Sequence, residues 1–193
     1  MSRNTGKRCL LHTCCAPCAS YVLEYLTPQY DCTLFFYNPN ISTKLEYDKR
    51  LDELFRYNKD AGFNADIIDG GYDGNIFENA VIGLEDAPER GPRCDICFRL
   101  RLAKTAELAS DFDLFATTLT VSPHKNTTQI NTIGASFEKY LPSDFKKNNG
   151  YKRSIELSKQ YNLYRQNFCG CRYSVNSCGQ RPPVFSRGSL TCS

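Results

Sequence analysis

The chain has 193 residues, of which 41% are hydrophobic and 23% charged, and its formal net charge is +3. This composition is typical of a globular protein and excludes a low-complexity or strongly charged disordered chain. No apolar run approaches the roughly 20 residues that span a bilayer, and the basic start of the sequence lacks the apolar stretch of a signal peptide. We therefore expect a cytoplasmic protein without a membrane partner.

The predicted elements alternate between strands and helices. Apolar runs bounded by turn residues predict strands at 7–12, 31–37, 65–68 and 113–118. Helical patterns are found at 16–26, 44–61, 94–110, from about 125 onward, and at 152–163, whereas residues 73–93 are less regular. This alternation predicts one α/β domain, over residues 1–177, with a doubly wound, mostly parallel sheet. We expect 178–193 to be an irregular tail.

Eleven cysteines are the most unusual feature of the composition. Their number is odd, and in a reducing cytoplasm thiols are more often metal ligands or redox centres than structural disulfides. Cys9 and Cys32 lie inside predicted strands and are expected in the core, because free cysteine is often buried. Cys192, next to the end of the sequence, suggests no function.

Two groups of cysteines are placed at predicted helix starts. Cys14, Cys15 and Cys18 follow the first strand, and Cys94 and Cys97 are three residues apart at the start of a later helix. Helix N-termini favour thiolates, and four thiolates from two such turns suit a [4Fe–4S] cluster or a tetrahedral zinc ion. Spacing alone does not separate the two. The Cys15–Cys18 pair also fits a thioredoxin-like thiol oxidoreductase, although that function would leave the later pair unexplained.

Four further features could contribute to the same site. Cys169 and Cys171 flank a glycine and could form a strained, reducible disulfide or bind a second metal. Asp95 lies between two proposed ligands and is either an oxygen ligand or a helix cap. The segment Ser122–Asn126 follows the fourth strand and opens a helix, which suits phosphate binding, and His12 is placed to support the neighbouring cysteines.

Positive charge is concentrated near the C-terminus. Residues 144–193 contain nine lysines and arginines against only Asp144 and Glu156. This asymmetry predicts a polyanionic partner such as a phosphate backbone, or else a solvated helix and tail. Three tyrosines in this region could stack on bases or pack in the core: Tyr161, Tyr164 and Tyr173. A non-catalytic zinc-binding RNA module is a further possibility.

Over most of residues 7–175 the chain resembles the QueH-type epoxyqueuosine reductase family. The resemblance is carried by LLHTCCAPCASYVLEYL (10–26), GLEDAPERGPRCDICFRLRLAKTAELA (83–109), FATTLTVSPHKNTTQINTIG (115–134) and YLPSDFKKNNGYKRSIELSKQYNLYRQNFCGCRYS (140–174). It implies a HUP-like, Rossmannoid fold. It also implies cobalamin-independent reduction of epoxyqueuosine, at the wobble position of tRNA, to queuosine.

The resemblance also implies a role for particular residues. Cys14, Cys15, Cys94 and Cys97 match the ligands of a [4Fe–4S] cluster, and Cys169 and Cys171 match a redox-active disulfide. A further iron is implied beside the cluster, for which Cys18 and Asp95 are the candidates. The basic part, about 144–177, would bind the tRNA through Lys146, Lys147, Lys152, Arg153 and Arg165. The electron donor that the reaction requires is not identified by the sequence.

Overall fold

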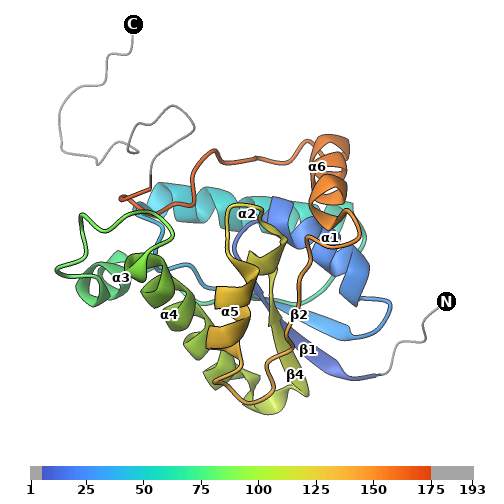
Figure 1. Ribbon diagram of the computed structural model, residues 1–193. Coiled ribbons are helices and arrows are strands. Elements are labelled where there is room, and N and C mark those ends of the chain that lie inside the picture. The colour runs from blue at the N-terminus through green and yellow to red at the C-terminus, as the bar shows by residue number, and fades with distance from the viewer. Residues whose placement is uncertain (1–5, 175–193) are drawn as a thin grey trace, which may run out of the picture.

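The computed structural model describes residues 6–174, so the predicted tail, Cys178 and Cys192 lie outside the described part. Its strands are β1 (Arg8–Thr13), β2 (Asp31–Phe36), β3 (Ile67–Asp69) and β4 (Leu114–Thr117). Its α-helices are α1 (Ala16–Leu26), α2 (Lys44–Asp60), α3 (Gly74–Ala80), α4 (Pro92–Leu108), α5 (Thr127–Gly134) and α6 (Gly150–Gln160). Two 3-10 turns follow α4 and β4: η1 (Ala109–Asp111) and η2 (Thr118–Val121). Figure 1 shows their arrangement.

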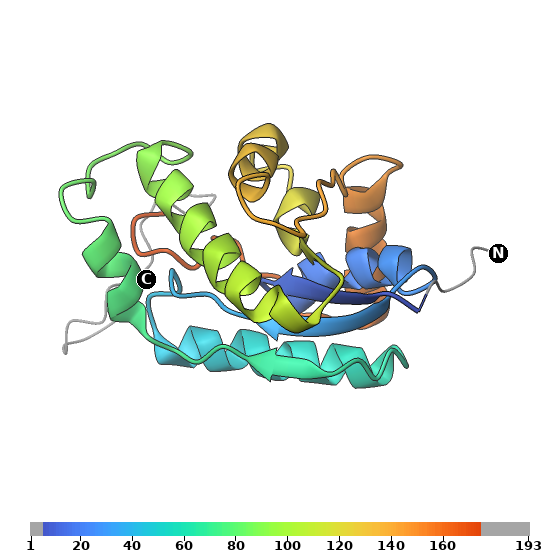
Figure 2. The ribbon, with the colours of Figure 1, turned by 90° about the horizontal axis from the view of Figure 1, so that it is seen from below.

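The four strands form one parallel sheet in the order β3-β2-β1-β4. Side chains alternate between its two faces, as the pleat requires. Cys9 and Leu11 of β1 pack with α1 and α2, whereas Leu10 packs with α4 and α5. Figure 2 shows α2 and α4 on opposite sides of the strands. The predicted doubly wound α/β domain is therefore confirmed.

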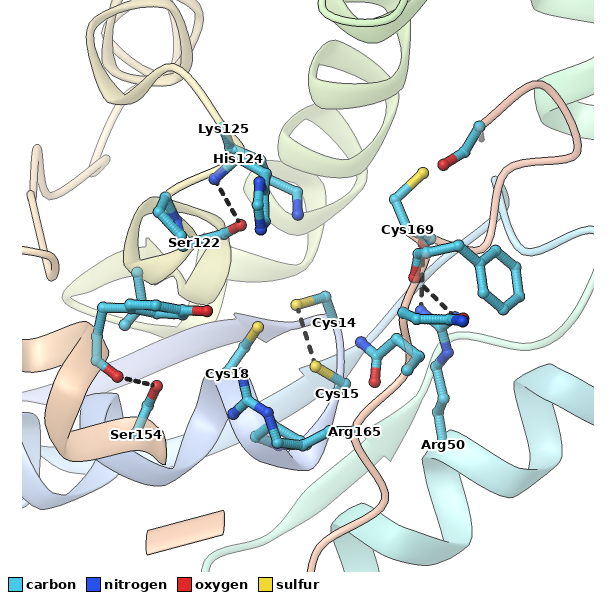
Figure 3. Close-up of a pocket in the computed structure, with 18 of the residues that line it drawn as sticks. Cys14, Cys15, Cys18, Arg50, Ser122, His124, Lys125, Ser154, Arg165 and Cys169 are labelled. Atoms are coloured by element: carbon cyan, nitrogen blue, oxygen red, sulfur yellow. Dashed lines mark hydrogen bonds between the residues drawn. The ribbon is translucent and has the colours of Figure 1, made fainter. Parts of the chain in front are cut away.

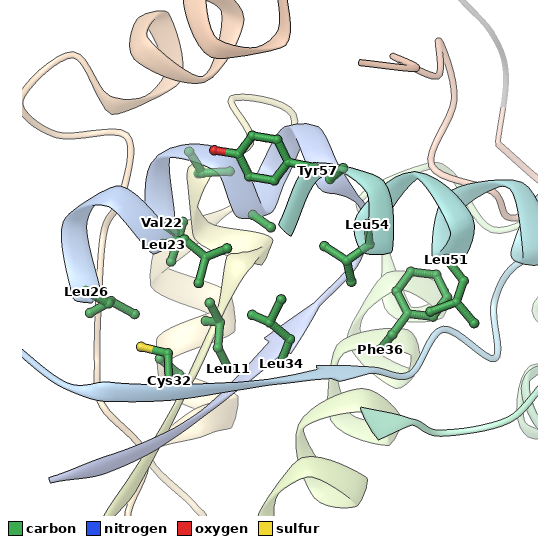
Figure 4. Close-up of a cluster of buried hydrophobic side chains, with 14 of the residues drawn as sticks. Leu11, Val22, Leu23, Leu26, Cys32, Leu34, Phe36, Leu51, Leu54 and Tyr57 are labelled. Atoms are coloured by element: carbon green, nitrogen blue, oxygen red, sulfur yellow. The ribbon is translucent and has the colours of Figure 1, made fainter. Parts of the chain in front are cut away.

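The core beneath α1 and α2 is apolar and tightly closed. Leu11, Leu34 and Leu54 are fully buried there, and the ring of Phe36 meets that of Tyr47 edge to face at 4.9 Å. Figure 4 shows the leucines of the two helices above the strand side chains. Cys32 lies in the same cluster, directly opposite Cys9 in the strand register. Both cysteines are core residues, as predicted.

Several element boundaries differ from the prediction for local reasons. A short helix, α3, lies within the segment predicted to be irregular, where it buries only Phe77 and so shows little periodicity. Helix α4 begins two residues early because Pro92 occupies its first position, where its missing N–H costs nothing. Helix α6 begins at Gly150, where a Cβ atom would lie 2.0 Å from the carbonyl oxygen of Phe145. Only glycine allows this close approach.

No helix among residues 6–174 is long and apolar enough to cross a membrane.

Candidate active site

The site lies where the sheet changes its winding direction. The chain leaves β1 into α1 on one face and leaves β4 toward α5 on the other, so the carboxyl ends of these neighbouring strands frame a crevice. A cavity of about 590 Å³ opens there. Residues from the start of α1, the turn before α5, helix α6 and the C-terminal segment line it, including Cys14, Cys18, Lys125, Tyr151 and Cys169. Figure 3 shows this arrangement.

Three cysteines converge at the end of β1. The sulfur atoms of Cys14, Cys15 and Cys18 all lie within 4.8 Å of one another, and those of Cys14 and Cys15 are 3.8 Å apart. Thr118 of η2 orders this turn, because its hydroxyl accepts a hydrogen bond from the Cys14 amide at 3.2 Å. Among residues 6–174, no other set of three or more His, Cys, Asp or Glu side chains gathers its ligand atoms so closely. The triad could therefore bind a metal.

The electrostatics of the triad favour one thiolate. Hydrogen bonds from Cys15 and Cys18 hold the pKa of the Cys14 thiol well below its usual range, and the positive charges of Lys125 and Arg101 act in the same direction. Hydrogen bonds to Cys14 and Cys15 raise the pKa of Cys18, because they favour its protonated form. Burial acts to lower the pKa of Lys125, but the neighbouring thiolates outweigh it and raise that pKa. An anionic sulfur and a cationic ammonium group therefore coexist in this cavity.

Cys94 and Cys97 lie outside the triad, on the wall of a smaller cavity of about 70 Å³. They occupy the first two turns of α4, where the Arg90 amide donates to the Cys94 sulfur at 3.3 Å. Cys169 and Cys171 line the same small cavity, and Cys169 also lines the larger one. The structure thus places the predicted cluster ligands on two adjoining cavities that share the Cys169 wall.

Cys169 and Cys171 are both free thiols in this structure, and no disulfide joins them. A hydrogen bond from Cys171 instead lowers the pKa of Cys169 to about 5, whereas that of Cys171 is raised. The intervening Gly170 has φ +102°, and a Cβ atom there would lie 2.9 Å from Ile41. Glycine is therefore required between the two thiols, by backbone conformation and by packing. The pair has a thiolate and a proton donor side by side.

The loop after β2 and Arg50 of α2 hold the backbone around Cys169 in place. The Asn40 amide and the Arg50 guanidinium both donate to the Cys169 carbonyl oxygen, at 3.3 and 3.2 Å, and the Ser42 amide donates to Gly170 at 3.0 Å. The Oδ1 atom of Asn40 is buried without a hydrogen-bond partner. Because Asn40 also lines the small cavity, it presents an unused acceptor beside the cysteines.

Replacing Glu53 with glutamine is expected to loosen this C-terminal segment. The Glu53 carboxylate accepts a hydrogen bond from the Tyr164 amide at 2.6 Å and pairs with Arg56, and these contacts with Arg56 and Tyr164 lower its pKa. A carboxylate with a lowered pKa stabilises the fold above its unfolded pKa and loses that contribution as the pH falls through the folded value. We expect Glu53→Gln to cost about 1–2 kcal/mol in urea unfolding at pH 7.

The cost should begin to shrink as the pH falls below the unfolded glutamate pKa of about 4.3, and it should approach zero once the pH has fallen through the lowered folded pKa, where the native side chain is uncharged. An equal cost at pH 7 and pH 3.5 would contradict this electrostatic explanation. Glu107→Gln is the matched control, because Glu107 is an exposed helical glutamate paired only with Lys104.

The remaining candidate residues take varied places. Asp95 accepts a hydrogen bond from Gln129 of α5 and lies outside the cysteine triad. His12 is fully buried, and burial together with Arg101 lowers its pKa to about 3, so its imidazole is neutral. His124 is exposed at the rim of both cavities. His12 contacts Thr117, Tyr37 and Arg101 and lies outside the cysteine triad, so its supporting role stays a prediction.

The predicted tRNA-binding cations divide into free and engaged side chains. Lys147 and Lys152 are exposed, whereas Arg165 lines the large cavity and donates to the Ser158 hydroxyl at 3.0 Å. Arg153 forms an ion pair with Glu24 at 2.8 Å. Lys146 braces the α5 turn by donating to the Lys125 carbonyl oxygen at 3.1 Å.

The three tyrosines of this region make contacts within the protein. Tyr161 packs edge to face on Tyr57 at 5.2 Å, and the Tyr173 hydroxyl donates to Glu78 at 2.8 Å. The Lys49 ammonium lies 3.5 Å from the centre of the Tyr164 ring. These contacts fit the packing alternative for all three.

Three site residues were not predicted from the sequence: Asn40, Arg50 and Arg101. The positions of Asn40 and Arg50 depend on contacts with a segment more than 100 residues away, which no local pattern reveals. Arg101 could have been predicted from the sequence, because it follows Cys97 by four residues on one helix and so lies on the same helix face.

The residues present fit a thiolate-bound metal group. Thiolates are soft ligands that favour iron–sulfur clusters or zinc. Among the described residues, the large cavity carries Arg50, Arg90, Arg101, Lys125 and Arg165 against the single carboxylate of Glu89. This excess of positive charge suits an anionic cluster or an anionic substrate.

Comparison with known proteins identifies the family. The family model described as "Epoxyqueuosine reductase QueH" matches residues 9–177. A Streptococcus pyogenes protein of that name is 46% identical over 181 residues, covering 88% of this chain and 71% of the relative. The chain belongs to the QueH family. Further QueH relatives are found in Staphylococcus epidermidis, with 42% identity over 88% of this chain and 77% of the relative, and in Thermotoga maritima, with 34% identity over 92% and 95%.

The QueH assignment confirms the resemblance seen in the sequence and the Rossmann-like fold expected from it. It supports neither a thioredoxin-like oxidoreductase nor a zinc-binding RNA module. The converging cysteines at the end of β1 fall inside the matched region, as do Cys94, Cys97, Cys169 and Cys171.

Proposed function

We propose that this chain reduces epoxyqueuosine in tRNA to queuosine. The observation that carries the proposal is the convergence of Cys14, Cys15 and Cys18 on a cavity whose opposite wall holds Cys169. A cavity of about 590 Å³ is of the size that takes a small molecule or a single nucleoside. The QueH relatives carry the name of this activity.

We assign a [4Fe–4S] cluster to Cys14, Cys15, Cys94 and Cys97. The assignment is supported by the thiolate character of Cys14 and by the position of all four residues on the two adjoining cavities. Cys18 and Asp95 are the proposed ligands of an additional iron. Of these two, Cys18 has the stronger support, because its sulfur lies within 4.8 Å of two proposed cluster ligands.

The reaction removes one oxygen atom and needs two electrons and two protons. Both C–O bonds of the epoxide break, a C=C bond forms, and the oxygen leaves as water. When bound, the metal centre would supply single electrons and a Lewis acid for the oxygen. Oxidation of the Cys169 thiolate and the Cys171 thiol to a disulfide releases two electrons and one proton. The Lys125 ammonium in the same cavity supplies the second proton, which balances the reaction. An external donor then reduces the disulfide.

Residues of the chain decide which of these two sulfur atoms is the thiolate. Cys169 is held as the thiolate by the hydrogen bond from Cys171, and the positive charge of Lys125 also lowers its pKa. Because Asn40 and Arg50 fix the Cys169 backbone, the thiolate keeps its place between the two cavities. Lys125 carries a proton at its Nζ atom in the same cavity.

The tRNA would approach from the side of α6. Lys147 and Lys152 are exposed there and Arg165 lies at the cavity wall, so they are the best placed of the predicted cations to contact phosphates. Lys146 and Arg153 are held by partners within the protein, whereas Arg165 donates to Ser158 but is still exposed at the cavity. A tRNA substrate and reduced thiols are both consistent with a protein that acts in the cytoplasm.

The proposal is tested with anaerobically reconstituted protein, a strong reductant and tRNA carrying epoxyqueuosine. Mass spectrometry of the digested tRNA should show the modified nucleoside lighter by one oxygen atom. Cys169→Ser should abolish multiple turnover, whereas Cys9→Ser, a buried strand cysteine far from the cavities, should leave it unchanged. If protein fully loaded with its cluster left the epoxyqueuosine unreduced, the proposal would be contradicted.

Iron analysis of single variants separates the two metal assignments. Cys94→Ala should lose the whole cluster, about four irons per chain, whereas Cys18→Ala should lose only the additional iron. The reverse pattern would show that Cys18, and not Cys94, holds the cluster. A colourless protein that binds only zinc after reconstitution would favour a zinc-binding RNA module.

A further inference from the structure

Arg101 is a buried cation at the centre of the site. Its side chain lies in the middle of α4, is 3% exposed and lines both cavities. It follows Cys97 by one helical turn, so the guanidinium lies beside that sulfur, with Nη1 3.9 Å from it. No other described cation combines this burial with contact to a proposed cluster ligand.

The hydrogen-bond partners of Arg101 are neutral. Its Nε atom lies 3.3 Å from His12 Nε2, and Nη2 donates to the side-chain oxygen of Asn38. Two neutral tautomers fit the contacts of His12. Either Nε2 accepts from Arg101 while Nδ1–H donates to Thr117 at 2.8 Å, or Nε2–H donates to the Tyr37 carbonyl oxygen at 3.1 Å while Nδ1 accepts from Thr117. The imidazole is neutral in both tautomers. It cannot balance the charge of Arg101.

A carboxylate does not balance this charge either. Among residues 6–174, no Asp or Glu lies within ion-pair distance of Arg101. The comparison with Arg50 is direct, because Arg50 is equally buried but pairs with Glu46 at 2.7 Å. A buried charge without a counter-charge is strongly unfavourable. Cysteine thiolates are the anions available to Arg101.

We propose that Arg101 is the counter-ion of the metal centre and raises its reduction potential. The inference rests on the proposed function, since it needs the thiolate-bound cluster. A cluster bound by four thiolates carries a net negative charge, and its reduction by one electron adds one more negative charge. A fixed positive charge therefore stabilises the reduced form more than the oxidised form, and a buried position with little water makes this effect large. Arg101 acts here as a positioning residue.

The alternative is a purely structural cross-link. Arg101 connects β1, the loop after β2 and α4 through His12, Asn38 and Cys97, and this could be its whole role. The two roles respond differently to substitution. Arg101→Lys keeps the charge and loses the planar fork, whereas Arg101→Gln keeps hydrogen-bonding capacity and loses the charge.

The experiment measures the cluster's reduction potential in native protein, Arg101→Gln and Arg101→Lys, each reconstituted anaerobically, with iron content and melting temperature recorded. Arg99→Gln is the matched control, because Arg99 lies on the same helix but is exposed. At a potential where the native cluster is half reduced, Arg101→Gln should show a ratio of reduced to oxidised cluster about tenfold lower. That ratio corresponds to a midpoint about 59 mV more negative. Arg101→Lys should stay near native and Arg99→Gln should be unchanged.

Each outcome decides the question. A folded Arg101→Gln that fails to load iron, while Arg101→Lys loads, also supports the counter-ion role. A loaded Arg101→Gln with the native potential, or a lysine variant as impaired as the glutamine variant in loading, potential or folding, would overturn it. If the native protein takes up no cluster, the proposed function itself fails, and the inference fails with it.

Discussion

Cys14→Ala is expected to yield a folded protein that holds no cluster and does not reduce epoxyqueuosine. Cys14 is the thiolate of the triad, so its removal takes away the ligand best prepared to bind iron. The loss of activity should exceed the roughly 100-fold typical of losing an outer-shell partner. Iron content, visible absorption and turnover of epoxyqueuosine-tRNA measure the effect.

Cys32→Ala is the control for this variant. Cys32 is also buried, but it lies in the core between β2 and α1, away from both cavities. It should load iron and turn over like the native protein, with a stability cost of about 1 kcal/mol. If Cys14→Ala kept native iron and activity, the ligand assignment at the end of β1 would be wrong.

Phe36→Ala should give the largest loss of stability. Phe36 is fully buried between the sheet and α2, and its ring packs against Tyr47. Truncating such a side chain leaves a cavity that the parallel sheet cannot easily close, at a cost of about 3–5 kcal/mol. That is a large part of the total stability of a typical domain. Urea unfolding followed by circular dichroism measures it.

Phe55→Ala is the matched control, because Phe55 lies on α2 but is 48% exposed. Its cost should remain within about 0.5 kcal/mol. Similar costs for the two variants would show that the packing beneath α2 is not what stabilises this half of the domain.

Local pattern was sufficient for most of the fold. Helix α1 has the predicted bounds, and the order of strands and helices is as expected. These features depend on side-chain periodicity over short windows, which the sequence displays directly. The misjudged start of α4 has a local cause as well, since Pro92 could have been recognised as a first helical residue. Helix α3 was missed because a short helix with one buried residue has almost no periodicity.

The site was predictable only where it follows a strand end. Cys14 and Cys15 come directly after β1, and ligands of parallel sheets bind at the carboxyl ends of the strands, so their place at the crevice follows from sequence and topology. Spacing also predicted that Cys94 and Cys97 share a helix face. It could not show that they line a second cavity together with Cys169 and Cys171.

The sequence by itself determined the alternation of elements, the family resemblance, and the cysteines that we propose carry the chemistry. Only the tertiary structure decided which of those cysteines meet, that Cys169 and Cys171 are free thiols, and that Arg101 is buried without a carboxylate. The physical reason is the distance along the sequence over which each property is decided. Helices and strands follow from residues a few positions apart, whereas burial and charge pairing depend on segments joined by the long β3–β4 crossover and by the loop after β2.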